Sequence, residues 1–178
     1  MKKEFIIRNA IRSIPGFPKP GILFRDVTTL MKNEKAFRLS VELLADKSLK
    51  FGRYKYIAGI EARGFVFGSI LAEKTGKGFV PVRKPGKLPS DVLSIEYELE
   101  YGMDKIEIHR DAVVKGERYL VVDDLLATGG TAEAACRLIE SGGGIVAGCL
   151  FLVELPELGG RRKLQGREVI SIIEFEGE

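Results

Sequence analysis

Short apolar runs alternate along the middle of the chain with segments whose apolar residues recur at helical spacing. Runs at residues 54–60, 79–83, 119–123 and 145–153 have the length and composition of strands buried on both faces. After the third run, apolar residues recur three and four positions apart, at Ala132, Ala135, Cys136 and Ile139. This alternation predicts an α/β fold with a mainly parallel, twisted sheet flanked by helices.

The N-terminal part follows a different pattern. Residues 4–13 place apolar residues at roughly helical spacing and predict a short helix, and a second helix is expected to start at Asn33 or Glu34. Between them, residues 14–25 hold three of the seven prolines. We therefore expect a rigid loop there, without regular structure in its first half. Packing and ligand binding are equally good explanations of its exposed aromatic residues.

Apolar and polar side chains alternate strictly in residues 95–101 and again in residues 105–109. A period of two is typical of half-exposed strands, so these segments predict a hairpin arm that projects from the sheet. His109, the only histidine, lies at the end of this arm. We expect it to be exposed or structural and not a catalytic base. Residues 169–175 predict a last strand, after a basic turn near Gly159 that is expected to be solvated.

Two adjacent carboxylates, Asp123 and Asp124, stand where the third apolar run is expected to end. The loop that follows is small and rich in glycine and hydroxyl groups, and consists of Ala127, Thr128, Gly129, Gly130 and Thr131. Backbone N–H groups of such a loop can converge on one point, and the helix N-terminus adds positive charge there. A glycine pair alone is often only a turn, and an aspartate pair alone is often only solvated. Together within one strand-to-helix turn they favour a sugar-phosphate site.

The details of this loop exclude two common phosphate-binding motifs. No lysine follows the glycines, so the loop is not a Walker A motif, and no Gly-x-Gly-x-x-Gly is present. Residues 121–131, Val-Val-Asp-Asp-Leu-Leu-Ala-Thr-Gly-Gly-Thr, instead resemble the phosphoribosyl pyrophosphate signature of the type I phosphoribosyltransferase family. Among the members of this family, those that use adenine have the residues most similar to this segment. The resemblance extends from about residue 14 to residue 159.

The resemblance implies a type I phosphoribosyltransferase fold in a single domain, residues 1–178. Its parts would be an N-terminal hood at residues 1–33, a core at residues 34–178 and a flexible β-hairpin arm at about residues 84–110. It also implies the reaction, which is transfer of the 5-phosphoribosyl group from phosphoribosyl pyrophosphate to adenine. The products would be AMP and pyrophosphate, as in purine salvage.

The same resemblance implies a role for each part of the signature segment. The loop at residues 127–131 would anchor the 5-phosphate. Asp123 and Asp124 would accept hydrogen bonds from the ribose hydroxyls and face the positive charge that develops at the anomeric carbon. Because successive strand residues point to opposite sides, the two carboxylates are not expected to share one role. Mg²⁺ would be bound mainly by the pyrophosphate, so no cage of protein ligands is needed, and the sequence shows none.

Two further segments are expected to contact the pyrophosphate. The first follows the strand at residues 54–60 and consists of Glu61, Ala62 and Arg63, and the resemblance implies a cis peptide bond between Glu61 and Ala62. The second is a proline-stiffened basic loop with Arg83, Lys84 and Lys87. Such a loop could simply be solvated, but its clustered cations in a nearly neutral chain favour a polyphosphate clamp.

The remaining site residues come from the resemblance alone. Leu23, Phe24 and Arg25 would form a hood against adenine, with an aromatic face stacked on the purine. Glu100 would handle the proton of the base, and Tyr101 would help to cover the site as part of a lid. The family is commonly dimeric, so a homodimer is expected.

Composition and charge limit which other classes of protein and partner are expected. The 178 residues are 45% hydrophobic, which suits one domain with one core. The net charge is only +3 and the charges are interspersed, so no nucleic-acid partner is indicated. Cys136 and Cys149 sit in apolar patterns and are expected to be buried thiols. With no signal peptide and no membrane-length apolar run, a cytoplasmic protein is expected.

Two alternatives stay open at this stage. A regulatory protein of the same fold could bind the sugar pyrophosphate and act on DNA, although 178 residues leave no room for a DNA-binding domain. A second possibility is an enzyme of this fold that uses another base, such as xanthine or hypoxanthine. The backbone geometry that selects the base is not visible in the sequence.

Overall fold

A computed structural model of the chain describes residues 2–17, 19–99 and 102–176. Its centre is a five-stranded sheet in the order β4-β3-β7-β8-β9, in which every neighbouring pair is parallel. The strands are β3 (Tyr56–Ile60), β4 (Gly78–Val82), β7 (Arg118–Leu126), β8 (Ile145–Glu154) and β9 (Val169–Glu174). The predicted α/β class and parallel sheet are confirmed.

Alternate strand residues pack into two different hydrophobic cores. Leu120 and Val122 of β7 belong to one core, whereas Tyr119 and Val121 belong to the other. All four are fully buried. Both faces of the sheet are covered, and this explains why its strands are continuous apolar runs in the sequence.

One core lies under the helices that precede β3 and the helix that follows it. These are α1 (Lys2–Ala10), α2 (Thr28–Lys32), α3 (Glu34–Ser48) and α4 (Arg63–Thr75). The start of α3 is the one that was predicted, and its cap is Asn33, whose side-chain oxygen accepts the Ala36 amide at 3.0 Å. The first helix is shorter than predicted and ends at Ala10. Short 3₁₀ helices are also present at η1 (Leu49–Phe51), η2 (Arg110–Ala112) and η3 (Pro156–Leu158).

The second core lies under α5 (Gly130–Ser141), with the short α6 (Gly160–Lys163) beside it. Ala132, Ala135, Cys136 and Ile139 are buried there, as the helical spacing predicted. Cys136 and Cys149 are free, buried thiols whose sulfurs lie 3.5 Å apart. They fill this core, in agreement with the sequence analysis.

The prediction of an irregular first half for residues 14–25 is confirmed only in part, because Ile14 and Pro15 belong to a strand whereas residues 16, 17 and 19 lie outside helices and strands. Residues on either side of the loop form an antiparallel hairpin of β1 (Arg12–Pro15) and β2 (Leu23–Asp26), which we call the hood hairpin. Pro15 is the last residue of its strand, where a missing N–H costs little. Proline therefore marks the end of a strand here and does not prevent one.

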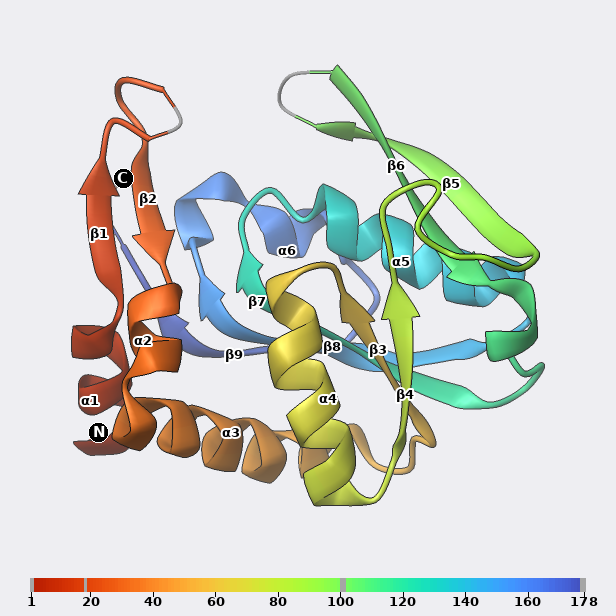
Figure 1. Cartoon of the computed structure of the whole chain (residues 1–178), viewed down its shortest axis with the longest axis horizontal. Helices are drawn as coiled ribbons and strands as arrows, with labels where there is room; N and C mark the ends of the chain where they lie inside the picture. The colour runs from red at the N-terminus through yellow and green to blue at the C-terminus, as the bar shows by residue number, and fades with distance from the viewer. Residues whose placement is uncertain (1, 18, 100–101, 177–178) are drawn as a thin grey trace.

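The predicted arm is present as an antiparallel hairpin, β5 (Val92–Leu99) and β6 (Gly102–His109), which we call the arm hairpin. Tyr97, Ile106 and Ile108 of this hairpin are buried in the core under α5. Figure 1 shows the hood hairpin and the arm hairpin rising on the same side of the sheet, at opposite ends of the molecule. The β7–α5 loop lies between them.

The central strand is longer than predicted. The expected end was Asp123, but pairing with β8 continues through Leu125 and Leu126. Asp123 and Asp124 therefore lie within the paired part of β7 and not beyond it. Pairing with β8 holds the backbone of this part of the strand in place.

Candidate active site

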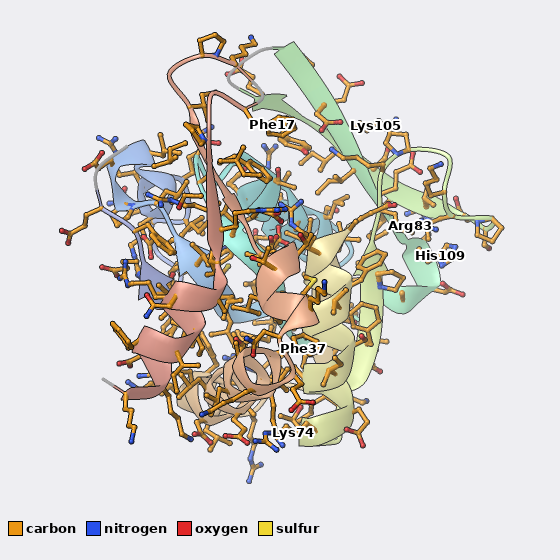
Figure 2. The ribbon with its side chains drawn as sticks, turned by 60° about the vertical axis from the view of Figure 1, so that its left-hand side comes forward. Phe17, Phe37, Lys74, Arg83, Lys105 and His109 are labelled. Atoms are coloured by element: carbon orange, nitrogen blue, oxygen red, sulfur yellow. The ribbon has the colours of Figure 1, made fainter. Side chains whose placement is uncertain are left out.

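The carboxyl ends of β3, β4 and β7 meet on the side of the sheet where the two hairpins rise. In Figure 2, Arg83 and Phe17 lie in this upper half of the molecule, while Lys74 lies at the opposite end. A cavity of about 120 Å³ opens here, and its lining includes Glu61, Arg83, Lys84, Asp123 and Thr131. Open parallel sheets bind ligands at this edge, so the fold brings together three of the predicted segments at the expected place.

The loop between β7 and α5 has the shape that the sequence predicted. A second cavity is lined by Asp123 and the loop itself, residues 125–132. Gly129 has φ of +79°, a left-handed conformation that side chains rarely adopt, and α5 begins at the next residue. The free N–H groups at the start of α5 and the helix dipole make this hollow suitable for a phosphate.

Asp123 and Asp124 have different surroundings, as alternation along a strand predicts. Asp124 is almost fully buried, and its Oδ2 accepts a hydrogen bond from Arg63 Nε at 2.5 Å. Asp123 lines both cavities instead. Its Oδ1 accepts the amide of Asp124 at 2.8 Å, which helps to hold the carboxyl in place.

The electrostatics of these groups also differ. Desolvation by the surrounding protein raises the pKa of Asp123 well above its usual range, and the nearby charge of Asp124 raises it further. Burial lowers the pKa of Arg63, but its ion pair with Asp124 outweighs this effect and the pKa is raised. The site therefore holds a carboxyl that resists ionisation beside a firmly charged arginine. A cationic group entering the cavity would favour the ionised form of Asp123.

The peptide bond between Glu61 and Ala62 is cis, as expected. The carboxylate of Glu61 accepts hydrogen bonds from Arg83 Nε at 3.2 Å and Nη2 at 3.1 Å, and from the Lys84 amide at 3.0 Å. The hydrogen bonds from Arg83 and Lys84 lower the pKa of Glu61. A carboxylate repels a pyrophosphate directly, so its contacts indicate that Glu61 orients the basic loop.

The basic loop is tied down on its other side by residues that the sequence analysis did not select. Lys84 Nζ pairs with Asp104 of the arm hairpin and lies 3.3 Å from the hydroxyl of Tyr97. Thr131 belongs to the loop at residues 127–131, which we call the phosphate loop, and it donates to the same hydroxyl at 3.2 Å. Tyr97 was noted only as a member of an alternating strand, and nothing in the sequence marked Asp104, because their partners are distant along the chain. Lys87 contributes its carbonyl, which accepts Arg83 Nη1 at 3.0 Å.

The predicted base-binding residues lie on the hood hairpin. The Phe24 ring meets that of Phe17 edge to face, with centroids 5.1 Å apart. The guanidinium of Arg25 is buried, donates to Ser13 Oγ at 2.6 Å and lies 4.3 Å from the ring centroid of Phe175. The side chain of Arg25 is thus used in packing, and Arg25 can offer a base only its backbone groups. The lid residues Glu100 and Tyr101 lie outside the described residues.

The basic residues of the turn near Gly159, Arg161, Arg162 and Lys163, are exposed as expected, but Arg161 also pairs with a buried carboxylate. Arg161 Nε and Nη2 each donate to the carboxylate of Glu154 at 2.7 Å, and Ser171 Oγ donates to it at 2.6 Å. The Glu154 side chain is only 3% exposed. The sequence shows a glutamate in an apolar strand and three basic residues in a turn, but the pairing itself depends on the fold. His109 is half-buried and does not line either cavity.

Within residues 2–17, 19–99 and 102–176, no group of three histidine, cysteine, aspartate or glutamate side chains could hold a metal ion. Asp123 is one carboxyl that faces the cavity. This donor set fits a magnesium ion that keeps water and substrate phosphates as its other ligands.

The length and polarity of the helices bear on membrane insertion. In the part of the chain that the structure describes, no helix is long and apolar enough to cross a membrane.

Comparisons with known proteins agree with this geometry. The protein-family model described as phosphoribosyl transferase domain matches residues 26–177 of this chain. An adenine phosphoribosyltransferase of Chlorobium chlorochromatii (strain CaD3) is 59% identical over 175 residues, which are 97% of this chain and 99% of that protein. One from Caldanaerobacter subterraneus subsp. tengcongensis is also 59% identical, over 95% of this chain and 97% of that protein.

Solved structures give the same result. The crystal structure of adenine phosphoribosyltransferase from Thermoanaerobacter pseudethanolicus matches with a TM-score of 0.93 and 56% identity, over 97% of this chain and 99% of that chain. The enzyme from Saccharomyces cerevisiae, complexed with an imino-altritol bisphosphate and adenine, matches with a TM-score of 0.89 and 37% identity, over 96% and 98% of the two chains.

Proposed function

The chain belongs to the phosphoribosyl transferase family, and we propose on this basis that it transfers the 5-phosphoribosyl group of phosphoribosyl pyrophosphate to adenine. The products are AMP and pyrophosphate, so the enzyme is a pentosyltransferase of purine salvage. The observation that carries this function is that the cavity beside the basic loop and the cavity of the phosphate loop share Asp123 and Thr131 in their linings. A bisphosphorylated sugar has an anion at each end, and the site has a separate binding element for each.

In the proposed mechanism, the 5-phosphate is bound by the backbone N–H groups of residues 127–131 and by the hydroxyls of Thr128 and Thr131. Asp123 faces the ribose and accepts hydrogen bonds from its hydroxyl groups. The approach of positive charge at the anomeric carbon favours the ionised form of Asp123, which in turn stabilises that charge. Asp124 acts mainly on Arg63, whose guanidinium it holds at the edge of the cavity.

The bond from the anomeric carbon to the pyrophosphate oxygen breaks as adenine N9 forms its bond on the opposite face, with inversion. Arg63, Arg83, Lys84 and Lys87 are proposed to stabilise the leaving pyrophosphate, and Glu61 and Ala62 form the turn that positions this charge. Magnesium, when bound through the pyrophosphate, would neutralise part of the same charge. Leu23, Phe24 and the backbone of Arg25 would hold the base. Glu100 would take its proton, and Tyr101 would cover the site.

Three further features belong to this proposal. A homodimer is expected from the family resemblance, as is a cytoplasmic location. The hood at residues 1–33 and the arm at about residues 84–110 are proposed to act as parts of one domain with the core.

An assay of pyrophosphate release with adenine, hypoxanthine, guanine, xanthine and orotate tests the function. Adenine should be the preferred acceptor by orders of magnitude. Replacing both Asp123 and Asp124 with asparagine should lower turnover by orders of magnitude while the protein stays folded. Near wild-type turnover in this double variant would contradict the mechanism, and preference for another base would contradict the substrate.

A further inference from the structure

The hydroxyl group of Tyr97 connects three segments that are far apart in the sequence. It donates to Asp104 Oδ2 at 3.0 Å and accepts hydrogen bonds from Lys84 Nζ at 3.3 Å and from Thr131 Oγ1 at 3.2 Å. A phenol has one proton to donate and two lone pairs, so all of its hydrogen-bonding capacity is used. The Tyr97 residue itself is only 5% exposed, and its position is therefore fixed by packing.

The network occupies groups that the reaction needs. Thr131 has a single hydroxyl proton, and it is directed to Tyr97 rather than into the phosphate hollow. The ammonium group of Lys84 is paired with the Asp104 carboxylate. Thr131 and Lys84 both line the cavity between the basic loop and Asp123. The arm hairpin therefore supplies a carboxylate and a phenol to two side chains assigned above to the two phosphate ends of the substrate.

Charge favours this arrangement as long as no other anion is present. Burial lowers the pKa of Lys84, but the hydrogen bonds to Asp104 and Tyr97 outweigh it and raise the pKa. For Asp104, burial raises the pKa, and the hydrogen bonds from Lys84, the Lys105 amide and Tyr97 lower it by more. Both partners are held in their charged forms. A pyrophosphate that binds Lys84 must compete with a carboxylate that is already in place.

We propose that Asp104 and Tyr97 act as an internal competitor for substrate, holding Lys84 and Thr131 until phosphoribosyl pyrophosphate displaces them. This inference rests on the proposed function and deepens it, because it assigns positioning residues that weaken the binding of anions at the same site. Substrate binding would break the contact of the arm hairpin with the basic loop and with the phosphate loop in one step.

Calorimetric titration with inorganic pyrophosphate tests the Asp104 part. Asp104→Asn keeps the shape of the side chain and removes its charge, so Lys84 loses its ion pair and is held less tightly. We expect pyrophosphate to bind about two- to fivefold more tightly than to the unchanged protein, the range that partly exposed ion pairs support. Asp91→Asn is the matched control, since Asp91 pairs not with Lys84 but with Arg110 at the base of the arm hairpin, at 2.8 Å. The control should bind pyrophosphate as the unchanged protein does.

Titration with ribose 5-phosphate tests the Tyr97 part. Tyr97→Phe keeps the buried ring and removes only the hydroxyl, which leaves the Thr131 proton free for the 5-phosphate. Tighter binding of ribose 5-phosphate is expected, together with a lower KM for phosphoribosyl pyrophosphate and a largely unchanged KM for adenine. A purely structural role of Tyr97 would not produce this separation of the two KM values.

Each negative result has its own meaning. If pyrophosphate binds the unchanged protein but binds Asp104→Asn no more tightly, the internal competitor is disproved. Weaker binding to Asp104→Asn would show that Asp104 instead positions Lys84 for the substrate. If Tyr97→Phe binds ribose 5-phosphate no more tightly, the part concerning Thr131 is disproved. If neither probe binds the unchanged protein, the failure is that of the proposed function. Melting temperatures of all variants show whether each one is folded.

Discussion

Gly160 lies directly against the carbonyl oxygen of Ala127, and a methyl group built on its Cα would come within 2.3 Å of that oxygen. Its carbonyl oxygen, in turn, lies where a side chain at Gly129 would have to be placed, at 2.5 Å. The start of α6 thus supports the phosphate loop from behind through backbone contacts. A residue larger than glycine at position 160 must displace the loop that we propose to bind the 5-phosphate.

The first prediction concerns this contact. Gly160→Ala should raise the KM for phosphoribosyl pyrophosphate about tenfold or more, with a smaller effect on the KM for adenine, because the loop can no longer keep its position. Overpacking of this kind should also lower the free energy of unfolding by about 1–3 kcal/mol. Steady-state kinetics with each substrate varied in turn provides the measurement.

Gly166→Ala is the matched control. Gly166 has φ of +86° and open space around it, so alanine there is strained by about 1–2 kcal/mol but pushes on no neighbour. It should lower stability and leave both KM values unchanged. Equal kinetic effects of the two substitutions would show that the support of the loop is not specific to Gly160.

The second prediction concerns the buried carboxylate below the same turn. Glu154→Gln removes the charge that Arg161 and Ser171 contact, and we expect it to lower the free energy of unfolding by about 2 kcal/mol. Glu140→Gln removes an exposed carboxylate paired with Arg167 and should cost less than about 1 kcal/mol. Chemical denaturation measures both. A cost for Glu154→Gln as small as that of Glu140→Gln would contradict a structural role for the buried pair.

The third prediction follows from the raised pKa of Asp123. Stability from a group with a raised pKa is complete below the pKa of the unfolded chain, near 3.8, and is lost as the pH rises through the higher pKa of the folded protein. Asp123→Asn does not titrate, so at neutral pH it should be more stable than the unchanged protein by about 1 kcal/mol. Its turnover should nevertheless fall strongly. The difference in stability should disappear near pH 3.8 and below; a difference that is independent of pH would disprove this explanation.

The fourth prediction concerns the hood hairpin. Hydrogen bonds from Thr28 and Arg12 lower the pKa of Asp26 to about 2. Because the pKa is lowered, the stability that it contributes is present above about pH 4 and is lost as the pH falls toward 2. Asp26→Asn should cost about 1–2 kcal/mol at pH 7 and progressively less below pH 4. Denaturation at several pH values checks this, and a constant cost down to pH 2 would be the contrary result.

Much of the fold could be predicted from the sequence because the sheet is buried on both faces. Its strands must then be apolar runs, and the helices between them must carry one apolar face, as α5 does from Ala132 to Ile139. Strand ends and proline-rich segments were less well predicted. Asp123 was expected to end its strand, and residues 14 and 15 were not expected to belong to one, because the apolar pattern and the proline content do not show the backbone pairing with β8 and with β2.

The same division holds for the active site. The sequence by itself determined the phosphate loop, the two aspartates and the basic loop, because each depends on a few neighbouring residues whose chemistry is local. Only the tertiary structure decided that Asp124 pairs with Arg63, that Glu154 pairs with Arg161, and that Tyr97 and Asp104 hold Lys84 and Thr131. These pairs join strands, loops and a hairpin that folding alone brings together, and no spacing along the chain encodes which charge will neutralise which.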